Sequence, residues 1–293
     1  MAVVNTNVNA SVAQNALARN ERAMNTAMER LSTGQRINSA SDDAAGLAIA
    51  SRMSSQIRGL ETGIRNANDA ISMISTADGA LVEVTNMLQR MRELALQSAN
   101  GTATSADRDY LNAEYQSLIN EIERIARNTQ WNGKTILTGD ADATDDSTVA
   151  FQVGANGGQT IVVDFGDISQ SGVATFADFN HSQFGHGPAN ISAGSKVDTA
   201  SSVQVVMTDI DSAITSINSQ RATYGAAVNQ LTYAVDNLSN VKVNSEAARS
   251  RIADADYAQE ISELARTQII SQAGTAMLAQ ANQLPQTVLS LLQ

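Results

Sequence analysis

The sequence predicts a mainly α-helical protein: an elongated helical bundle or coiled coil that both ends of the chain form, with a small β-hairpin region in the middle. Three observations predict this class. Apolar residues recur every seven positions on both sides of the centre. The 293 residues include only two prolines, the residue that most often breaks helices. Glycine and phenylalanine gather in the middle of the chain.

The longest repeat lies between Ala44 and Ala99, a stretch without proline. Asp42 and Asp43 precede it and offer capping oxygens and negative charge, so the helix is expected to begin near Ala44. At about 1.5 Å per residue this helix would be roughly 84 Å long, whereas a compact chain of this length is only about 50 Å across. The seven-residue spacing is typical of a coiled-coil seam, here formed by Leu60, Ala67, Ile74, Leu81, Leu88 and Ala95.

Two further helices follow the same logic. One is expected from Ser105 to Asn128, after a loop at Asn100–Thr102 that is short enough for an antiparallel return. Another begins after Ser201 and continues to about Ile252. Several matching seams imply a bundle in which the two halves of the chain pack together. The seam of the helix that begins after Ser201 contains Val203, Ile210, Ile217, Tyr224, Leu231 and Leu238.

The middle of the chain has a different character. Residues 132–195 hold ten of the eighteen glycines and all five phenylalanines. Apolar and other residues alternate in Val149–Val153 and again in Ile161–Phe165, which predicts a β-hairpin. The whole insert, about 132–198, carries eight acidic residues and two lysines, as expected of a solvent-facing tip.

Both ends of the chain lack charge. The first charged residue is Arg19, and Thr267–Gln293 contains none, with Pro285 expected to interrupt this last segment. Uncharged amphipathic helices expose apolar surface that favours burial against other copies of the chain. Two alternatives remain: pairing of the two ends within one molecule, and binding to a membrane surface, although the Lys/Arg-rich face typical of such binding is missing. The expected packing residues are Val3, Ala10, Leu17, Met24, Leu31, Ile270, Met277, Leu284, Val288 and Leu291.

Composition excludes several functions. A net charge of −11 argues against nucleic-acid binding, which needs clustered basic residues. No run of about 18 apolar residues is present, so no membrane span is expected, and the start lacks the basic region of a cleavable secretory signal. With no cysteine and two histidines, few groups remain for catalysis. We therefore expect no enzyme activity and no catalytic, cofactor-binding or metal-binding residues.

Four segments carry a family resemblance. Leu31–Met53 (LSTGQRINSASDDAAGLAIASRM) resembles the N-terminal signature of bacterial flagellin, and Gln89–Thr102, Asn128–Leu137 and Ser250–Gln293 are similar to further parts of that family. The resemblance implies a structural subunit of the extracellular flagellar filament, which serves swimming motility, exported without a cleavable signal. It also implies a short form without large outer domains, an inner domain of residues 1–42 with 255–293, and an outer bundle of residues 43–254.

The resemblance also implies partners. These are other copies of the chain, an export chaperone at the C-terminal segment, filament cap and hook-associated proteins, and host flagellin receptors. The residues that match the family's immune-receptor contact are Gln89, Arg90, Leu94 and Glu114. Two alternative functions stay open at this point: a hook–filament junction protein, and a soluble coiled-coil adhesion or signalling module.

Overall fold

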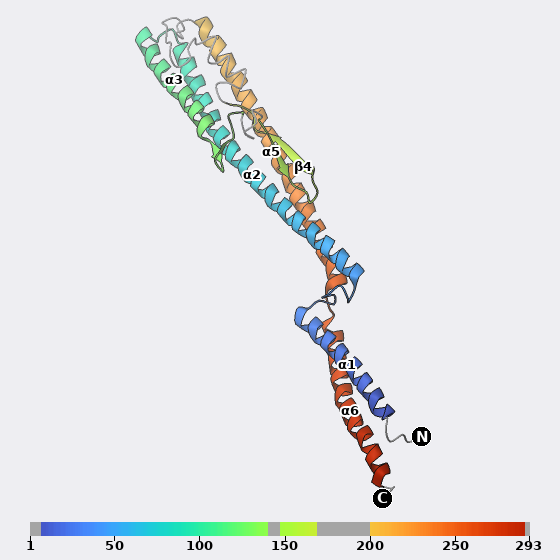
Figure 1. Cartoon of the computed structure of the whole chain (residues 1–293). Helices are drawn as coiled ribbons and strands as arrows, with labels where there is room; N and C mark the ends of the chain where they lie inside the picture. The colour runs from blue at the N-terminus through green and yellow to red at the C-terminus, as the bar shows by residue number, and fades with distance from the viewer. Residues whose placement is uncertain (1–6, 140–146, 169–199, 291–293) are drawn as a thin grey trace. The chain divides into compact units, whose positions relative to one another are not determined.

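The computed structural model describes residues 7–139, 147–168 and 200–290. The chain is mainly helical, as the sequence predicted, and Figure 1 shows the elements in chain order. The helices are α1 (Val8–Thr33), α2 (Ala44–Ser98), α3 (Ser105–Asn128), α5 (Ala200–Ala253) and α6 (Tyr257–Ser290). The strands are β1 (Gln130–Trp131), β2 (Lys134–Thr135), β3 (Thr148–Gln152) and β4 (Thr160–Asp164).

Contacts divide the chain into two units. One consists of residues 1–57 with 243–293, and the other of residues 58–242. The first contains α1, α6, the start of α2 and the end of α5. The second contains α3, the four strands and the remainder of α2 and α5. The predicted domain limits, residues 1–42 with 255–293 and residues 43–254, remain a prediction.

In the second unit, α2, α3 and α5 lie side by side around one hydrophobic core (Figure 1). Most residues of the predicted seams are part of this core, because the seven-residue spacing keeps them on one face of each helix. Ion pairs join the rims of α2 and α5, with 2.8 Å between Arg92 and Asp211 and 2.8 Å between Arg221 and Asp78. The buried seam residues of the two helices are Leu60, Ala67, Ile74, Leu81, Leu88, Ala95, Ile210, Ile217, Tyr224 and Leu231.

The helix starts are fixed by local hydrogen bonds. Asp43 Oδ1 accepts from the backbone N–H of Gly46 at 2.9 Å, so α2 begins where its sequence predicted. At α3, Thr104 and Asp107 form a capping box in which each side chain accepts from the other's backbone N–H. The hydrogen bonds from Thr104 hold the pKa of Asp107 below its ordinary value, because they stabilise the ionised carboxylate.

A short β-ribbon after α3 was not predicted. β1 and β2 pair antiparallel, with Trp131 opposite Lys134. Asn132 and Gly133 connect them with φ values of 50° and 81°. Two consecutive positive φ values define a type I′ turn, for which Asn-Gly is the preferred pair. That dipeptide was the signal available in the sequence. The chain that follows places Ile136 in the core at 0% exposure.

The predicted β-hairpin is confirmed as β3 and β4, paired antiparallel with Val149 opposite Val163. Phe165 follows β4 and lies buried beside Tyr224 of α5, with 5.6 Å between ring centroids. The Tyr224 hydroxyl donates to the backbone carbonyl of Phe165 at 2.7 Å. Burial raises the pKa of this hydroxyl, because the phenolate would be desolvated there.

The hairpin turn approaches α2 closely at a glycine. A Cβ added to Gly63 would lie 2.5 Å from the carbonyl oxygen of Val153. One turn further along α2, Asn66 Nδ2 donates to the carbonyl of Gln152 at 2.9 Å. Glycine at position 63 therefore sets the distance at which the hairpin packs on the helix.

We predict that Gly63→Ala lowers the free energy of unfolding by about 1–3 kcal/mol, because the new methyl group must displace the hairpin backbone. Gly79→Ala is the matched control on the same helix, where nothing lies within 4 Å of an added Cβ. It should raise stability by up to about 1 kcal/mol through helix propensity. Denaturant unfolding measures both, and equal effects of the two substitutions would contradict this account of the hairpin.

Candidate functional site

The chain ends form an antiparallel pair of helices, α1 and α6. In Figure 1 the start of α1 and the end of α6 lie at the same end of this pair. Two hydrogen bonds and one ion pair between the helices show their register. Asn7 Nδ2 donates to the carbonyl of Ala281 at 2.9 Å, and Asn20 Nδ2 donates to the carbonyl of Thr267 at 2.6 Å. Arg30 forms an ion pair with Glu260 at 3.1 Å. As residue numbers rise in α1, they fall in α6.

Small and polar side chains fill the interior of this pair. Ala27 is 2% exposed, Asn20 9% and Thr267 1%. The Thr267 hydroxyl donates to carbonyls of its own helix, 2.8 Å from that of Glu263. A buried polar residue in a helix pair specifies register at some cost in stability. The interior therefore aligns the two helices and contributes little hydrophobic free energy.

The Arg30–Glu260 ion pair lies where α1 ends and α6 begins. Its side chains are 29% and 11% exposed, so both are partly withdrawn from water. Beside it, α1 ends at Gly34 with φ of 70°, a left-handed conformation that glycine adopts without strain. The following residue, Gln35, forms a bridge with Asp254, in the short break between α5 and α6. This backbone bridge anchors the helix pair at its base.

Pro285 does not interrupt α6, contrary to the expectation from the sequence. The helix continues to Ser290, although proline lacks the N–H that would bond to the carbonyl four residues earlier. That carbonyl belongs to Ala281, and it accepts instead from Asn7 Nδ2. Asn7 is also the N-cap of α1, because its Oδ1 accepts from the Ala10 N–H at 3.0 Å. One side chain thus begins one helix and replaces a missing hydrogen bond in the other.

Large hydrophobic side chains lie on the outside of the pair. Several of them are exposed on both helices, whereas Ala27, Asn20 and Thr267 are buried and Leu17, Met24 and Leu31 are half-buried between the helices. Apolar surface of this kind marks an interaction site. We call these exposed residues the outer apolar face: Val8 at 57%, Val12 at 62%, Met28 at 55%, Ile261 at 55%, Ile269 at 67%, Ile270 at 44% and Met277 at 66% exposure.

The residues predicted to pack between subunits divide between these two faces. Ala10 is buried against α6, Leu17, Met24 and Leu31 are half-buried, and Ile270 and Met277 are exposed. Val3 and Leu291 lie outside the described residues, as do the side chains of Leu284 and Val288. Sequence reasoning missed Asn7, Asn20, Thr267 and Glu260; among these only Asn7 carried a signal, as a residue typical of helix N-caps.

A second candidate site surrounds Arg90 on α2. Its Nη2 and Nε lie 2.8 and 3.0 Å from Glu114 Oε1 on α3, and its Nη1 lies 3.0 Å from Glu93 Oε2. The hydrogen bonds that Arg90 donates to Glu114 raise the pKa of Arg90. Gln89 is exposed beside it. Arg90, Glu114 and Gln89 therefore present one polar surface across two helices.

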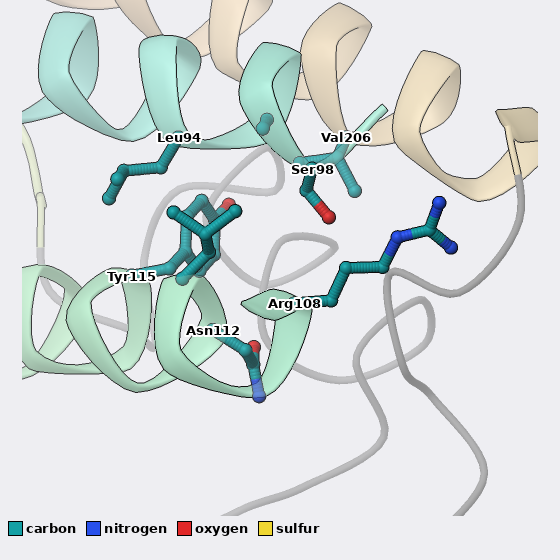
Figure 2. A pocket seen from close by; sticks show the side chains of 8 residues that line it. Leu94, Ser98, Arg108, Asn112, Tyr115 and Val206 are labelled. Atoms are coloured by element: carbon teal, nitrogen blue, oxygen red, sulfur yellow. The ribbon is translucent and has the colours of Figure 1, made fainter. Parts of the chain in front are cut away.

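Leu94 does not share that surface. It is 2% exposed, and Figure 2 shows it beside Tyr115 of α3 at the wall of a small cavity. The cavity holds about 10 Å³, which is the space of about one water molecule. Leu94 therefore positions α2 against α3 under the exposed residues. Leu96, at 56% exposure, is the apolar side chain that this stretch of α2 presents to solvent.

In the part of the chain that the structure describes, no three His, Cys, Asp or Glu side chains are grouped so that they could hold a metal ion. None of the helices described combines the length and apolar character that crossing a membrane requires.

Comparisons with known proteins identify the family. The profile for the bacterial flagellin N-terminal helical region matches residues 4–142, and the profile for the C-terminal helical region matches residues 207–292. Flagellin from Halalkalibacterium halodurans is 43% identical over 291 residues, which cover 99% of this chain and 100% of the relative. The chain belongs to the bacterial flagellin family.

A further relative agrees with this assignment, and a solved structure shares the fold. The flagellar filament 33 kDa core protein of Treponema phagedenis is 41% identical over 298 residues, 99% of this chain and 100% of the relative. A putative flagellar hook-associated protein from Vibrio parahaemolyticus has the same fold at a TM-score of 0.56, with 18% identity, 73% of this chain covered and 100% of that chain. As a flagellin, the chain is a structural, non-enzymatic subunit of the extracellular flagellar filament, serves motility and assembles with copies of itself.

We predict that Asn7→Leu weakens the α1–α6 pair by about 1–2 kcal/mol, because it removes both a helix cap and the partner of the Ala281 carbonyl. Hydrogen exchange of α6 amides measures the effect. Asn15→Leu, an exposed position on α1, is the matched control and should leave exchange in α6 unchanged.

A double-mutant cycle isolates the proline contact. In Pro285→Ala the Ala281 carbonyl regains a helical N–H partner, so Asn7→Leu should cost less in that background. Equal costs in both backgrounds would show that the Asn7 bond does not replace the one that proline lacks.

Proposed function

We propose that the outer apolar face of α1 and α6 is the surface through which this flagellin packs against other subunits in the filament. Residues 1–42 with 255–293 would then form the filament core. The observation that carries this proposal is the set of large hydrophobic side chains that the helix pair leaves exposed on both helices. Each large side chain withdrawn from water by a neighbour contributes about 1.5–3 kcal/mol, so repeated contacts can hold a polymer together.

The absence of charge supports the same surface. Thr267–Gln293 has no charged side chain, so neighbouring copies can approach α6 without desolvating an ion, which is costly. Before assembly the same apolar face would be exposed to water, and this favours the binding of an export chaperone to the C-terminal segment. The filament cap and the hook-associated proteins would meet subunits at the two ends of the filament, where this face lacks a neighbouring copy.

The test is elongation from filament seeds. Ile269→Asp places a carboxylate on the outer apolar face and should abolish elongation while the free subunit keeps its helix content. Val162→Asp is the matched control, because Val162 of β4 is 60% exposed, close to the 67% of Ile269. Elongation is read by electron microscopy. Normal growth of Ile269→Asp, or equal failure of both variants, would count against this surface.

We also propose that Arg90, Gln89 and Glu114 form a contact for the host receptor that senses flagellin. The match of these residues to the family motif supports the proposal, together with their exposure across α2 and α3. Leu94 would act from below by holding the two helices in place, since its side chain is buried.

A receptor reporter assay checks this second proposal. Arg90→Ala should lower the potency of the dissociated subunit by about tenfold or more, because it removes the charged group that would donate hydrogen bonds to the receptor. Arg92→Ala is the control: Arg92 is about as exposed as Arg90, at 42% against 49%, but it pairs with Asp211 of α5. The proposal would be wrong if both variants kept full potency or lost it equally.

A further inference from the structure

The methionines of this chain differ sharply in exposure. Met28 is 55% exposed and Met277 66%, whereas Met73 is 4% and Met91 0% exposed. The other described methionines are half-buried. Oxidation of a thioether requires that the oxidant reach the sulfur, so reactivity follows exposure. Among the methionines that the structure describes, Met28 and Met277 are therefore the sulfurs that an oxidant meets first, and Met73 and Met91 provide internal references.

Both exposed methionines belong to the outer apolar face. The contacts of Asn7 with Ala281 and of Leu17 with Gly274 place Met277 at the level of Val12 in the antiparallel pair. Met28 lies two residues before Arg30, whose partner is Glu260, and so at the level of Ile261. Each methionine thus lies at the same level along the helix pair as an exposed hydrophobic residue of the opposite helix.

We propose that Met28 and Met277 are oxidation sites through which peroxide stops the free subunit from joining a filament. The inference rests on the proposed packing role of the outer apolar face. Hydrogen peroxide transfers one oxygen atom to the sulfur: the S–O bond forms, the O–O bond breaks, the sulfur loses two electrons and the second oxygen leaves as water. The sulfoxide is polar, so it must be desolvated when a neighbouring subunit covers it.

The free subunit should keep its own fold after this reaction. The interior of the α1–α6 pair consists of residues such as Ala27, Asn20 and Thr267, and neither exposed methionine is part of it. In the filament the neighbouring copies would cover both sulfurs. Oxidation therefore acts on subunits before incorporation, and the finished filament resists the same dose. A methionine sulfoxide reductase with a thiol reductant reverses it by removing the oxygen as water.

The first experiment maps the chemistry without reference to assembly. The free chain is treated with limiting hydrogen peroxide and analysed by peptide mass spectrometry, with fragment spectra that separate Met28 from Met24. Sulfoxide should accumulate severalfold faster at Met28 and Met277 than at Met73 and Met91, and circular dichroism should show no loss of helix. Equal rates at all four positions would overturn the proposal.

The second experiment measures elongation from seeds. Untreated wild type and untreated Met28→Leu/Met277→Leu should both elongate; failure of untreated wild type would refute the packing role itself. After peroxide, wild type should lose elongation and the double variant should keep it. Growth of wild type that is oxidised at both positions, or arrest of the oxidised double variant, would overturn the oxidation proposal.

A third measurement avoids dependence on the leucine variant. Treatment of oxidised wild type with methionine sulfoxide reductase and dithiothreitol should restore elongation together with the unoxidised mass of the two peptides. Filaments treated with the same peroxide should show severalfold less sulfoxide at Met28 and Met277 than free subunits. Restored mass without restored growth, or equal oxidation of filaments and subunits, would contradict the mechanism.

Discussion

The pairing of α1 with α6 is the interaction on which the proposed assembly surface of this flagellin depends. Two helices alone enclose little volume, and here that volume holds alanine, asparagine and threonine side chains. Large hydrophobic residues such as Val12, Ile269 and Met277 lie outside, where the other helix of the pair does not cover them. The internal contacts, from Asn7 with Ala281 to Arg30 with Glu260, thus set alignment. We infer that most of the hydrophobic free energy of these helices becomes available only when copies meet.

In the unit of residues 58–242, by contrast, large hydrophobic side chains are buried within the chain itself. Its seams place leucine, isoleucine and methionine in one core, and charged pairs such as Arg92–Asp211 lie on the rims of its helices. Exposed ion pairs of this kind contribute little stability, so the hydrophobic core provides most of the stability of this unit. The β-hairpin adds a second layer on α2, where Gly63 permits close backbone contact. This unit buries its hydrophobic surface internally, whereas the paired ends leave large hydrophobic side chains exposed.

Exposure gives the outer apolar face a chemical consequence. In its proposed packing role this face stays apolar and accessible until assembly, which leaves its thioethers accessible too. Methionine fills irregular hydrophobic contacts but carries an oxidisable sulfur. Pro285 illustrates a related constraint on the same helix. It removes a hydrogen bond from α6, and the helix continues because Asn7 of the other chain end supplies a donor to Ala281.

The sequence by itself determined the long helices, their limits at Ala44, Ser105 and Asn128, the buried seams and the hairpin, because periodicity and capping are local properties. It also determined the family, through contiguous motifs. The tertiary structure decided which face of each terminal helix is covered: Ala10 turns inward and Met277 outward, and seven-residue spacing cannot distinguish these outcomes. Burial of Leu94 and the bond from Asn7 to Ala281 were equally beyond the sequence, since both depend on contacts between residues far apart in the chain.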